Sequence, residues 1–212
     1  MIIIGITGTL GSGKGTIVEY LTQYKGFNHY SVREYLKSEL NKQGISSNRD
    51  SFVELANSLR QKNGPSFIID ELYQQAEDGN KNSIIESIRT NGEIDSLKNK
   101  PIPFYLFTVD ADPRIRYKRI RQRDSETDRI SFDTFISNEK REMNSNDPNH
   151  QSLDKCIGVA DYSFTNNGSR EELFRKVEEV LIQIIGSNGN SRIHEIEKTE
   201  NVLKSIGDPG KE

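Results

Sequence analysis

The sequence contains a single cysteine, Cys156, in 212 residues, and it has no long apolar run. One thiol excludes an intramolecular disulfide and a cysteine zinc cluster, and it is typical of proteins in a reducing compartment. No stretch approaches the roughly 18 apolar residues that a transmembrane helix requires. We therefore expect a cytoplasmic protein that does not cross a membrane, with Cys156 as a small core residue. The short apolar run at residues 1–7 has no basic flank, so we interpret it as a strand and not as a signal peptide.

The sequence also lacks an excess of positive charge. Its 29 Lys and Arg residues are outnumbered by 32 Asp and Glu residues, which gives a net charge of −3. This balance argues against nucleic acid or a membrane surface as a partner. The chain length suits one α/β domain. We expect a small-molecule partner, and the composition leaves the oligomeric state open.

The turn after the first predicted strand is rich in glycine. It lies between the β-branched run at residues 1–7 and a predicted helix that starts near Ile17. This order of strand, glycine-rich turn with a lysine, and helix is the context of a phosphate-binding P-loop, or Walker A motif. Backbone N–H groups and the helix dipole favour an anion there, and Lys14 can reach the β- and γ-phosphates. The predicted nucleotide-binding residues are Gly8, Thr9, Leu10, Gly11, Ser12, Gly13, Lys14, Gly15 and Thr16. The alternative is a tight turn that happens to contain glycines.

One position departs from the usual P-loop. The residue after Lys14 is Gly15, whereas the consensus has a Ser or Thr whose hydroxyl meets Mg²⁺. Thr16 follows one residue later. We therefore expect Thr16 to hold a phosphate, or Mg²⁺ through water.

Predicted strands and helices alternate along the chain, which indicates a parallel sheet covered by helices on both faces. The predicted strands are residues 1–7, 27–30, 83–89, 104–109 and 160–165. The predicted helices lie near residues 17–25, 31–41, 50–63, 66–77, 93–97, 113–123, 132–143 and 169–185, with Asp50 or Ser51 as the N-cap of the third. Residues 1–186 form the expected domain, and residues 187–212 have the composition of a flexible polar tail.

Charged residues follow two of the predicted strands. Glu86 lies near the end of one, where a carboxylate can orient Mg²⁺ or accept a proton from an attacking hydroxyl. The alternative is an ordinary acidic residue at a strand end. Arg89 follows three residues later and can hold a substrate phosphate in a bidentate way.

The predicted helix at residues 113–123 contains five arginines and a lysine. Arg116, Arg119 and Arg123 share one face of it. Arginines on a lid can neutralise the charge that phosphoryl transfer places on the equatorial oxygens, so Arg119 and Arg123 are candidate catalytic residues. The alternative is a solvated face paired with the acidic residues at 124–128.

Three further residues are candidates for acceptor binding. Ser31 and Arg33 follow the second predicted strand, opposite the expected ATP site. Ser31 is also a good N-cap, and Glu34 completes a capping box. Arg60 is assigned to the same cleft, with a surface position as the alternative.

These features together resemble the P-loop small-molecule kinases, specifically the dephospho-CoA kinase and nucleoside monophosphate kinase group. The resemblance covers about residues 1–185, and its parts are the P-loop, residues 30–36, 86–93, 110–113 and 160–168. It implies a three-layer α/β/α fold with a five-stranded parallel sheet, a helical acceptor-binding flap near residues 31–80 and an arginine-rich lid near residues 114–145. It also implies ATP as the donor, Mg²⁺ held by Thr16 and Glu86, and Asn167 and Gly168 near the adenine base.

Two other functions are typical of proteins with a P-loop. A regulatory GTPase is disfavoured because the guanine-reading Asn-Lys-x-Asp motif is absent. A nucleotide-binding sensor without turnover remains an alternative. Similar P-loop domains occur fused to cytidine-deaminase domains, but this sequence lacks the His-x-Glu and Pro-Cys-x-x-Cys zinc signature.

Overall fold

A computed structural model of the chain describes residues 1–123, 129–145, 147 and 149–187. Its centre is a five-stranded parallel sheet with the strand order β2-β3-β1-β4-β5. This confirms the α/β class and the five-stranded parallel sheet that the sequence predicts. The strands are β1 (Ile3–Gly8), β2 (Asn28–Ser31), β3 (Ser83–Glu86), β4 (Phe104–Asp110) and β5 (Tyr162–Thr165).

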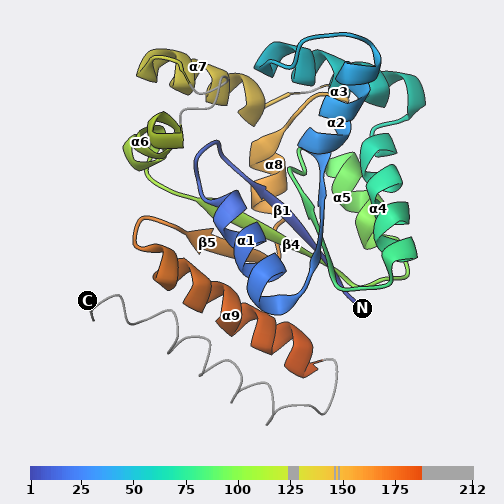
Figure 1. Cartoon of the computed structure of the whole chain (residues 1–212), viewed down its shortest axis with the longest axis vertical. Helices are drawn as coiled ribbons and strands as arrows, with labels where there is room; N and C mark the ends of the chain where they lie inside the picture. The colour runs from blue at the N-terminus through green and yellow to red at the C-terminus, as the bar shows by residue number, and fades with distance from the viewer. Residues whose placement is uncertain (124–128, 146, 148, 188–212) are drawn as a thin grey trace.

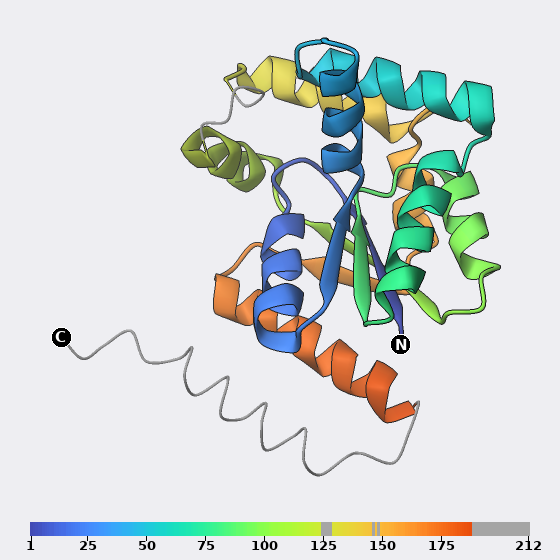
Figure 2. The same ribbon diagram turned by 45° about the vertical axis from the view of Figure 1, so that its right-hand side comes forward.

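Helices cover both faces of the sheet (Figures 1 and 2). Alternate residues of β1 point to opposite faces, so Ile4 and Ile6 belong to one core cluster and Ile3 to the other. The first cluster lies under α1 (Lys14–Lys25) and α9 (Arg170–Ser187). The second lies under α2 (Val32–Lys42), α4 (Phe67–Gly79), α5 (Asn91–Lys98) and α8 (Leu153–Gly158), with α3 (Arg49–Asn63) packed on α2 and α4.

Two helices lie beyond the carboxyl ends of the strands. Figures 1 and 2 show α6 (Pro113–Arg123) and α7 (Phe132–Met143) above the loop that follows β1, with α7 beside α3. Ion pairs join α7 to α3, between Arg49 and Glu142 and between Asp50 and Arg141. The predicted lid segment therefore touches the predicted acceptor flap.

Apart from shifts of one to three residues at other element ends, the structure differs from the sequence predictions in four places. The strand predicted over residues 83–89 ends at Glu86, because Ser87 has a φ of 72° that breaks the extended backbone. The N-cap of α3 is Asn48, and not Asp50 or Ser51, because the Asn48 side chain accepts from the Ser51 N–H. The six-residue helix α8 was not predicted. The last strand begins at Tyr162, two residues later than expected.

Two other predictions concern residues away from the site. Cys156 is fully buried, as expected, and burial raises the pKa of its thiol to about 12. In the part of the chain that the structure describes, no helix is both long and apolar enough to cross a membrane. Residues 188–212 of the predicted tail, and the acidic residues at 124–128, lie outside the described residues.

Candidate functional site

The loop between β1 and α1 depends on glycine at two close approaches. Gly8 has a φ of 136°, and a Cβ atom there would lie 2.2 Å from the backbone oxygen of Val109. Gly13 has a φ of 114°, and its Cβ would lie 2.2 Å from the Asn166 side-chain nitrogen. Any other L-residue would be both strained and crowded at these positions. The glycines therefore let β4 and the turn after β5 support the loop from behind.

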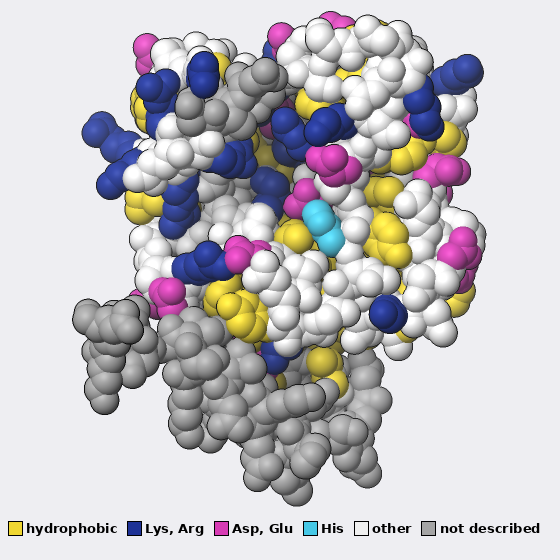
Figure 3. Space-filling view, in the orientation of Figure 1, with side chains coloured by type: hydrophobic (Ala, Val, Ile, Leu, Met, Phe, Trp, Pro, Cys, Tyr) yellow, Lys and Arg dark blue, Asp and Glu magenta, His cyan; other side chains and the backbone are white. Residues whose placement is uncertain are grey.

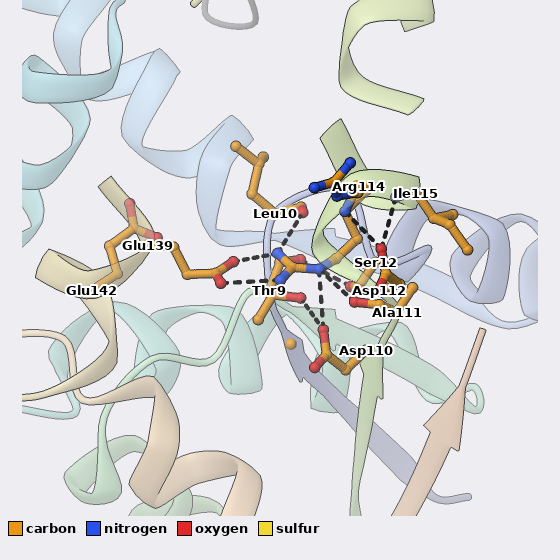
Figure 4. Close-up of polar contacts among 12 residues, drawn as sticks. Thr9, Leu10, Ser12, Asp110, Ala111, Asp112, Arg114, Ile115, Glu139 and Glu142 are labelled. Atoms are coloured by element: carbon orange, nitrogen blue, oxygen red, sulfur yellow. Dashed lines mark hydrogen bonds and ion pairs between the residues drawn. The ribbon is translucent and has the colours of Figure 1, made fainter. Parts of the chain in front are cut away.

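Two side chains from neighbouring strand ends hold this loop. The Thr9 hydroxyl donates to Asp110 at the end of β4, and the Asn166 amide donates to the Ser12 carbonyl oxygen at 2.7 Å. Figure 4 shows Thr9 and Asp110 side by side under the loop. Sequence reasoning missed both Asp110 and Asn166. Their position at the carboxyl ends of strands that flank the loop is the signal that could have identified them.

The Lys14 ammonium folds back onto the loop. Its Nζ donates to the carbonyl oxygens of Gly8 at 2.8 Å and Thr9 at 2.7 Å. Burial and the nearby Arg89, with a smaller contribution from Arg123, lower the pKa of Lys14 to about 7, although Glu86 and Glu142 act in the opposite direction. A ligand that brings negative charge close to the Lys14 amine would therefore favour its protonated form.

Glu86 lies at the end of β3, in register with Ile6 of β1 and Ser31 of β2. The Ser31 hydroxyl donates to Glu86 Oε1 at 3.0 Å, and His29 Nε2 lies 3.7 Å from the same oxygen. Burial alone would raise the pKa of Glu86, but His29, Ser31 and Lys14 together lower it. Glu86 is thus a charged carboxylate close to the loop, as the sequence predicts.

A cavity of about 570 Å³, here called the donor cavity, brings together most of the predicted site. In the face shown in Figure 3, Lys and Arg side chains gather around a hollow. The residues that line the donor cavity include residues 10–16 of the loop, Arg33, Glu86, Ser87, Arg89, Arg119 and Arg123. Burial lowers the pKa of Arg119, and its Nη1 is buried without a hydrogen-bond partner among the described residues.

Arg116 does not join Arg119 and Arg123 in the donor cavity, although the helical spacing predicts a shared face. Its guanidinium group is buried and pairs with Glu139 of α7. It also donates to the backbone oxygens of Ala111 at 2.7 Å and Leu10 at 3.3 Å. In Figure 4, dashed lines from the Glu139 carboxylate and from the Leu10 carbonyl oxygen meet at one guanidinium group. Arg116 therefore joins α6, α7 and the loop.

A second cavity, of about 120 Å³ and here called the acceptor cavity, adjoins the first. The two share Arg33, Ser87 and Arg89. Apolar residues of α2 and α3, such as Leu36 and Phe52, form part of its wall. Its charged lining residues are Arg33, Arg49, Arg60, Arg89 and Glu142, of which Arg49 and Glu142 were not predicted.

Arg60 lines the acceptor cavity and is not a surface residue. It is 1% exposed, and its Nε and Nη2 donate to Glu93 Oε1 at 3.0 and 2.7 Å. Glu93 Oε2 in turn accepts from the backbone N–H groups of Arg89, at 2.7 Å, and Thr90, at 3.0 Å. This network fixes Arg60 and the backbone of Arg89 relative to each other.

Five predicted residues stay outside the lining of both cavities, namely Gly8, Thr9, Ser31, Asn167 and Gly168. Ser31 points to Glu86 and caps α2 by accepting from the Glu34 N–H at 3.3 Å. Asn167 accepts from the Asp112 N–H at 2.8 Å. A Cβ at Gly168 would meet Glu172. The assignment of Asn167 and Gly168 to an adenine site therefore stays a prediction.

A metal ion at this site would depend on bound phosphates. No group of three or more His, Cys, Asp or Glu side chains in the described residues is arranged to hold a metal. Mg²⁺ usually keeps several waters and takes one or two carboxylates together with substrate phosphates. The charged Glu86 and Thr16 both line the donor cavity, and their oxygens suit such a partial shell.

Comparison with known proteins places the chain in a family. A model of an AAA domain family (AAA_18) matches residues 4–146, which include the loop, Glu86 and the arginines of both cavities. A UPF0200 protein of Methanococcus maripaludis strain C7 is 30% identical over 192 residues, which cover 87% of this chain and 98% of that protein. The chain belongs to the UPF0200 family. A UPF0200 protein of Pyrobaculum aerophilum is 26% identical over 183 residues, with coverage of 86% and 98%.

Solved structures resemble this UPF0200 fold. TT1252 from Thermus thermophilus has a TM-score of 0.55 at 20% identity and covers 86% of this chain and 97% of its own. A gluconokinase from Sinorhizobium meliloti has a TM-score of 0.56 at 12% identity, with coverage of 86% and 93%. At these identities the likeness concerns the fold. The chain therefore shares its α/β fold with these proteins.

Proposed function

We propose that this protein is an ATP-dependent kinase that transfers the γ-phosphoryl group to a nucleotide or nucleotide-like small molecule. Nucleoside monophosphates and dephospho-CoA are the acceptors that the sequence resemblance favours. The observation that carries the proposal is the junction of the two cavities, which share Arg33, Ser87 and Arg89. A P-loop cavity that opens directly onto an arginine-lined cavity suits a donor and an acceptor that meet end to end.

The donor cavity supplies the groups that phosphoryl transfer needs. The loop N–H groups and Lys14 bind the β- and γ-phosphates of ATP. Glu86 and Thr16 would hold Mg²⁺, which neutralises charge on the phosphate oxygens. Arg119 and Arg123 stabilise the negative charge of the transition state. The alternative role of Glu86 is to accept the proton of the attacking hydroxyl.

The acceptor cavity suits an anionic molecule. Arg33, Arg60 and Arg89 are the residues that we assign to acceptor binding, since all three line it. Ser31 is assigned a different part in acceptor chemistry, because its hydroxyl contacts Glu86. It orients the carboxylate that faces the acceptor hydroxyl.

The test is a screen for ATP consumption with nucleoside monophosphates, deoxynucleotides and dephospho-CoA as acceptors. We expect one acceptor class to support turnover by the wild type and not by Lys14→Ala. Lys37→Ala is the matched control, because Lys37 is exposed on α2 and lines neither cavity. Equal turnover by wild type and Lys14→Ala would overturn the proposal. Nucleotide binding without turnover on any acceptor would favour the sensor alternative.

A further inference from the structure

A carboxylate of α7 lies between two arginines of the acceptor cavity. Glu142 Oε1 pairs with Arg49 of α3, and Glu142 Oε2 accepts from Arg89 Nη1 at 3.0 Å. The Glu142 side chain is only 8% exposed. Burial alone would raise the pKa of Glu142, but the charges and hydrogen bonds of Arg89 and Arg49 lower it. The cavity therefore already holds one buried anion, which the protein itself provides.

This arrangement matches the way in which proteins bind anionic ligands. Two guanidinium groups around one carboxylate or phosphate form charge-assisted hydrogen bonds of good geometry. Here the two arginines come from α3 and from the segment after β3, whereas the carboxylate comes from the predicted lid. The anion and the groups that bind it thus belong to three different segments, all of them outside the strands of the central sheet.

The acceptor cavity offers more hydrogen-bond donors than Glu142 uses. Arg49 Nε and Arg60 Nη1 are both buried without a hydrogen-bond partner among the described residues. Both arginines line the cavity. A buried guanidinium N–H without an acceptor is unfavourable, so a ligand with additional oxygens would be favoured there. A phosphate group has three terminal oxygens that accept hydrogen bonds, one more than a carboxylate.

The charge of the cavity points in the same direction. Four arginines line it, and two carboxylates compensate them: Glu142 inside the cavity and Glu93, which pairs with Arg60. Two positive charges stay uncompensated while Glu142 is in place, and three when it leaves. A phosphate monoester carries a charge of about −1.5 to −2 at neutral pH, whereas a carboxylate carries only one negative charge. A dianion is therefore the better partner for these arginines.

We propose that Glu142 occupies the position of the acceptor's anionic group, and that an acceptor with a phosphate monoester displaces it. This inference rests on the acceptor role proposed above. It makes Glu142 a specificity-determining residue, because competition with the Glu142 carboxylate lowers the apparent affinity for every anion and leaves tight binding only to those that bind these arginines most strongly. It also narrows the acceptor class to molecules that already carry a phosphate monoester.

The test measures binding of inorganic phosphate by isothermal titration calorimetry, without ATP, to the wild type and to Glu142→Gln. The neutral, isosteric amide removes the competing charge, so we expect phosphate to bind about tenfold more tightly or better. A double variant, Glu142→Gln with Arg49→Gln, distinguishes phosphate in the acceptor cavity from phosphate at the P-loop, because Arg49 lines only the acceptor cavity. The gain should disappear in the double variant. A gain that persists would place the phosphate elsewhere and overturn the proposal.

The control for a mere loosening of α7 is Arg141→Gln. Arg141 makes the exposed ion pair with Asp50 between the same two helices, outside the cavity. It should leave phosphate affinity unchanged, and a gain equal to that of Glu142→Gln would contradict a specific role of Glu142.

If Glu142→Gln is poorly folded, its melting temperature provides the readout. Phosphate should raise that temperature more than in the wild type, and an equal rise would overturn the proposal. Because no turnover is measured, a protein that is not a kinase can still pass or fail this test.

Discussion

Nucleotide binding should be accompanied by proton uptake at Lys14. Burial and the nearby arginines lower the pKa of this amine to about 7. ATP places phosphate charge beside Nζ, so the pKa of Lys14 rises in the complex. The expected uptake is about 0.9 proton per nucleotide at pH 8, about 0.5 at pH 7 and about 0.1 at pH 6. Above pH 7, affinity for ATP should fall by up to about tenfold per pH unit, because binding then requires a proton from solution.

The measurement is isothermal titration calorimetry of ATP binding in buffers with different ionisation enthalpies. The slope of the observed enthalpy against the buffer ionisation enthalpy gives the number of protons taken up. Lys14→Arg is the matched control, because arginine stays charged at every pH used and the protons of ATP itself cancel in the comparison. Equal slopes for the two proteins at pH 8 would refute the reasoning, since Lys14 would then be charged before ATP arrives.

Four further predictions concern residues around the two cavities. Glu86→Gln should lower kcat about a hundredfold, while the affinity for ATP changes little. Steady-state kinetics provides the measurement, and an unchanged kcat would mean that Glu86 has only a structural role. The same variant should also lose less stability in acid. The pKa of Glu86 in the folded protein lies below its ordinary value of 4.5, so the charged carboxylate stabilises the wild type above pH 4.5. This stabilisation is lost as the pH falls through the folded pKa, and Glu86→Gln has none to lose. Glu93→Ala leaves Arg60 buried and unpaired, so urea denaturation should show a loss of about 3–5 kcal/mol; a loss below about 1 kcal/mol would mean that water replaces the carboxylate. Asn166→Ala removes the hydrogen bond to the Ser12 carbonyl oxygen. It should weaken ATP binding by about 1–3 kcal/mol and leave the circular dichroism spectrum unchanged. Asn167→Ala, at the neighbouring position, should weaken ATP binding only if Asn167 lies near the adenine base.

Features that are local in sequence were predicted well. The P-loop, the strand that carries Glu86 and the N-cap Ser31 each depend on residues within a few positions of one another. Alternating strands and helices were enough to predict the parallel sheet. The errors at element ends, such as the strand extended past Ser87, arise where a single φ angle ends the element and no residue type announces it.

The acceptor cavity was predicted only in part, because its contacts are distant in sequence. Arg49 and Glu142 are separated by 93 positions, and Arg89 and Glu142 by 53. Neither the charge pattern of α3 nor that of α7 indicates which residue on another helix it will meet. Arg60 was ambiguous for the same reason, since its partner Glu93 lies on another helix. Such pairs become visible only when the tertiary structure brings the helices together.

The support behind the P-loop has a consequence for the energetics of binding. Asp110 and Asn166 hold the loop through Thr9 and Ser12, and both anchors lie at the ends of strands in the central sheet. The loop conformation is therefore reached when the sheet forms, and its conformational entropy is lost during folding. A nucleotide that arrives later meets a preorganised cradle, so little of its binding free energy is spent on ordering the backbone. Folding stability and nucleotide affinity are thereby linked, and a substitution in either anchor should weaken both together.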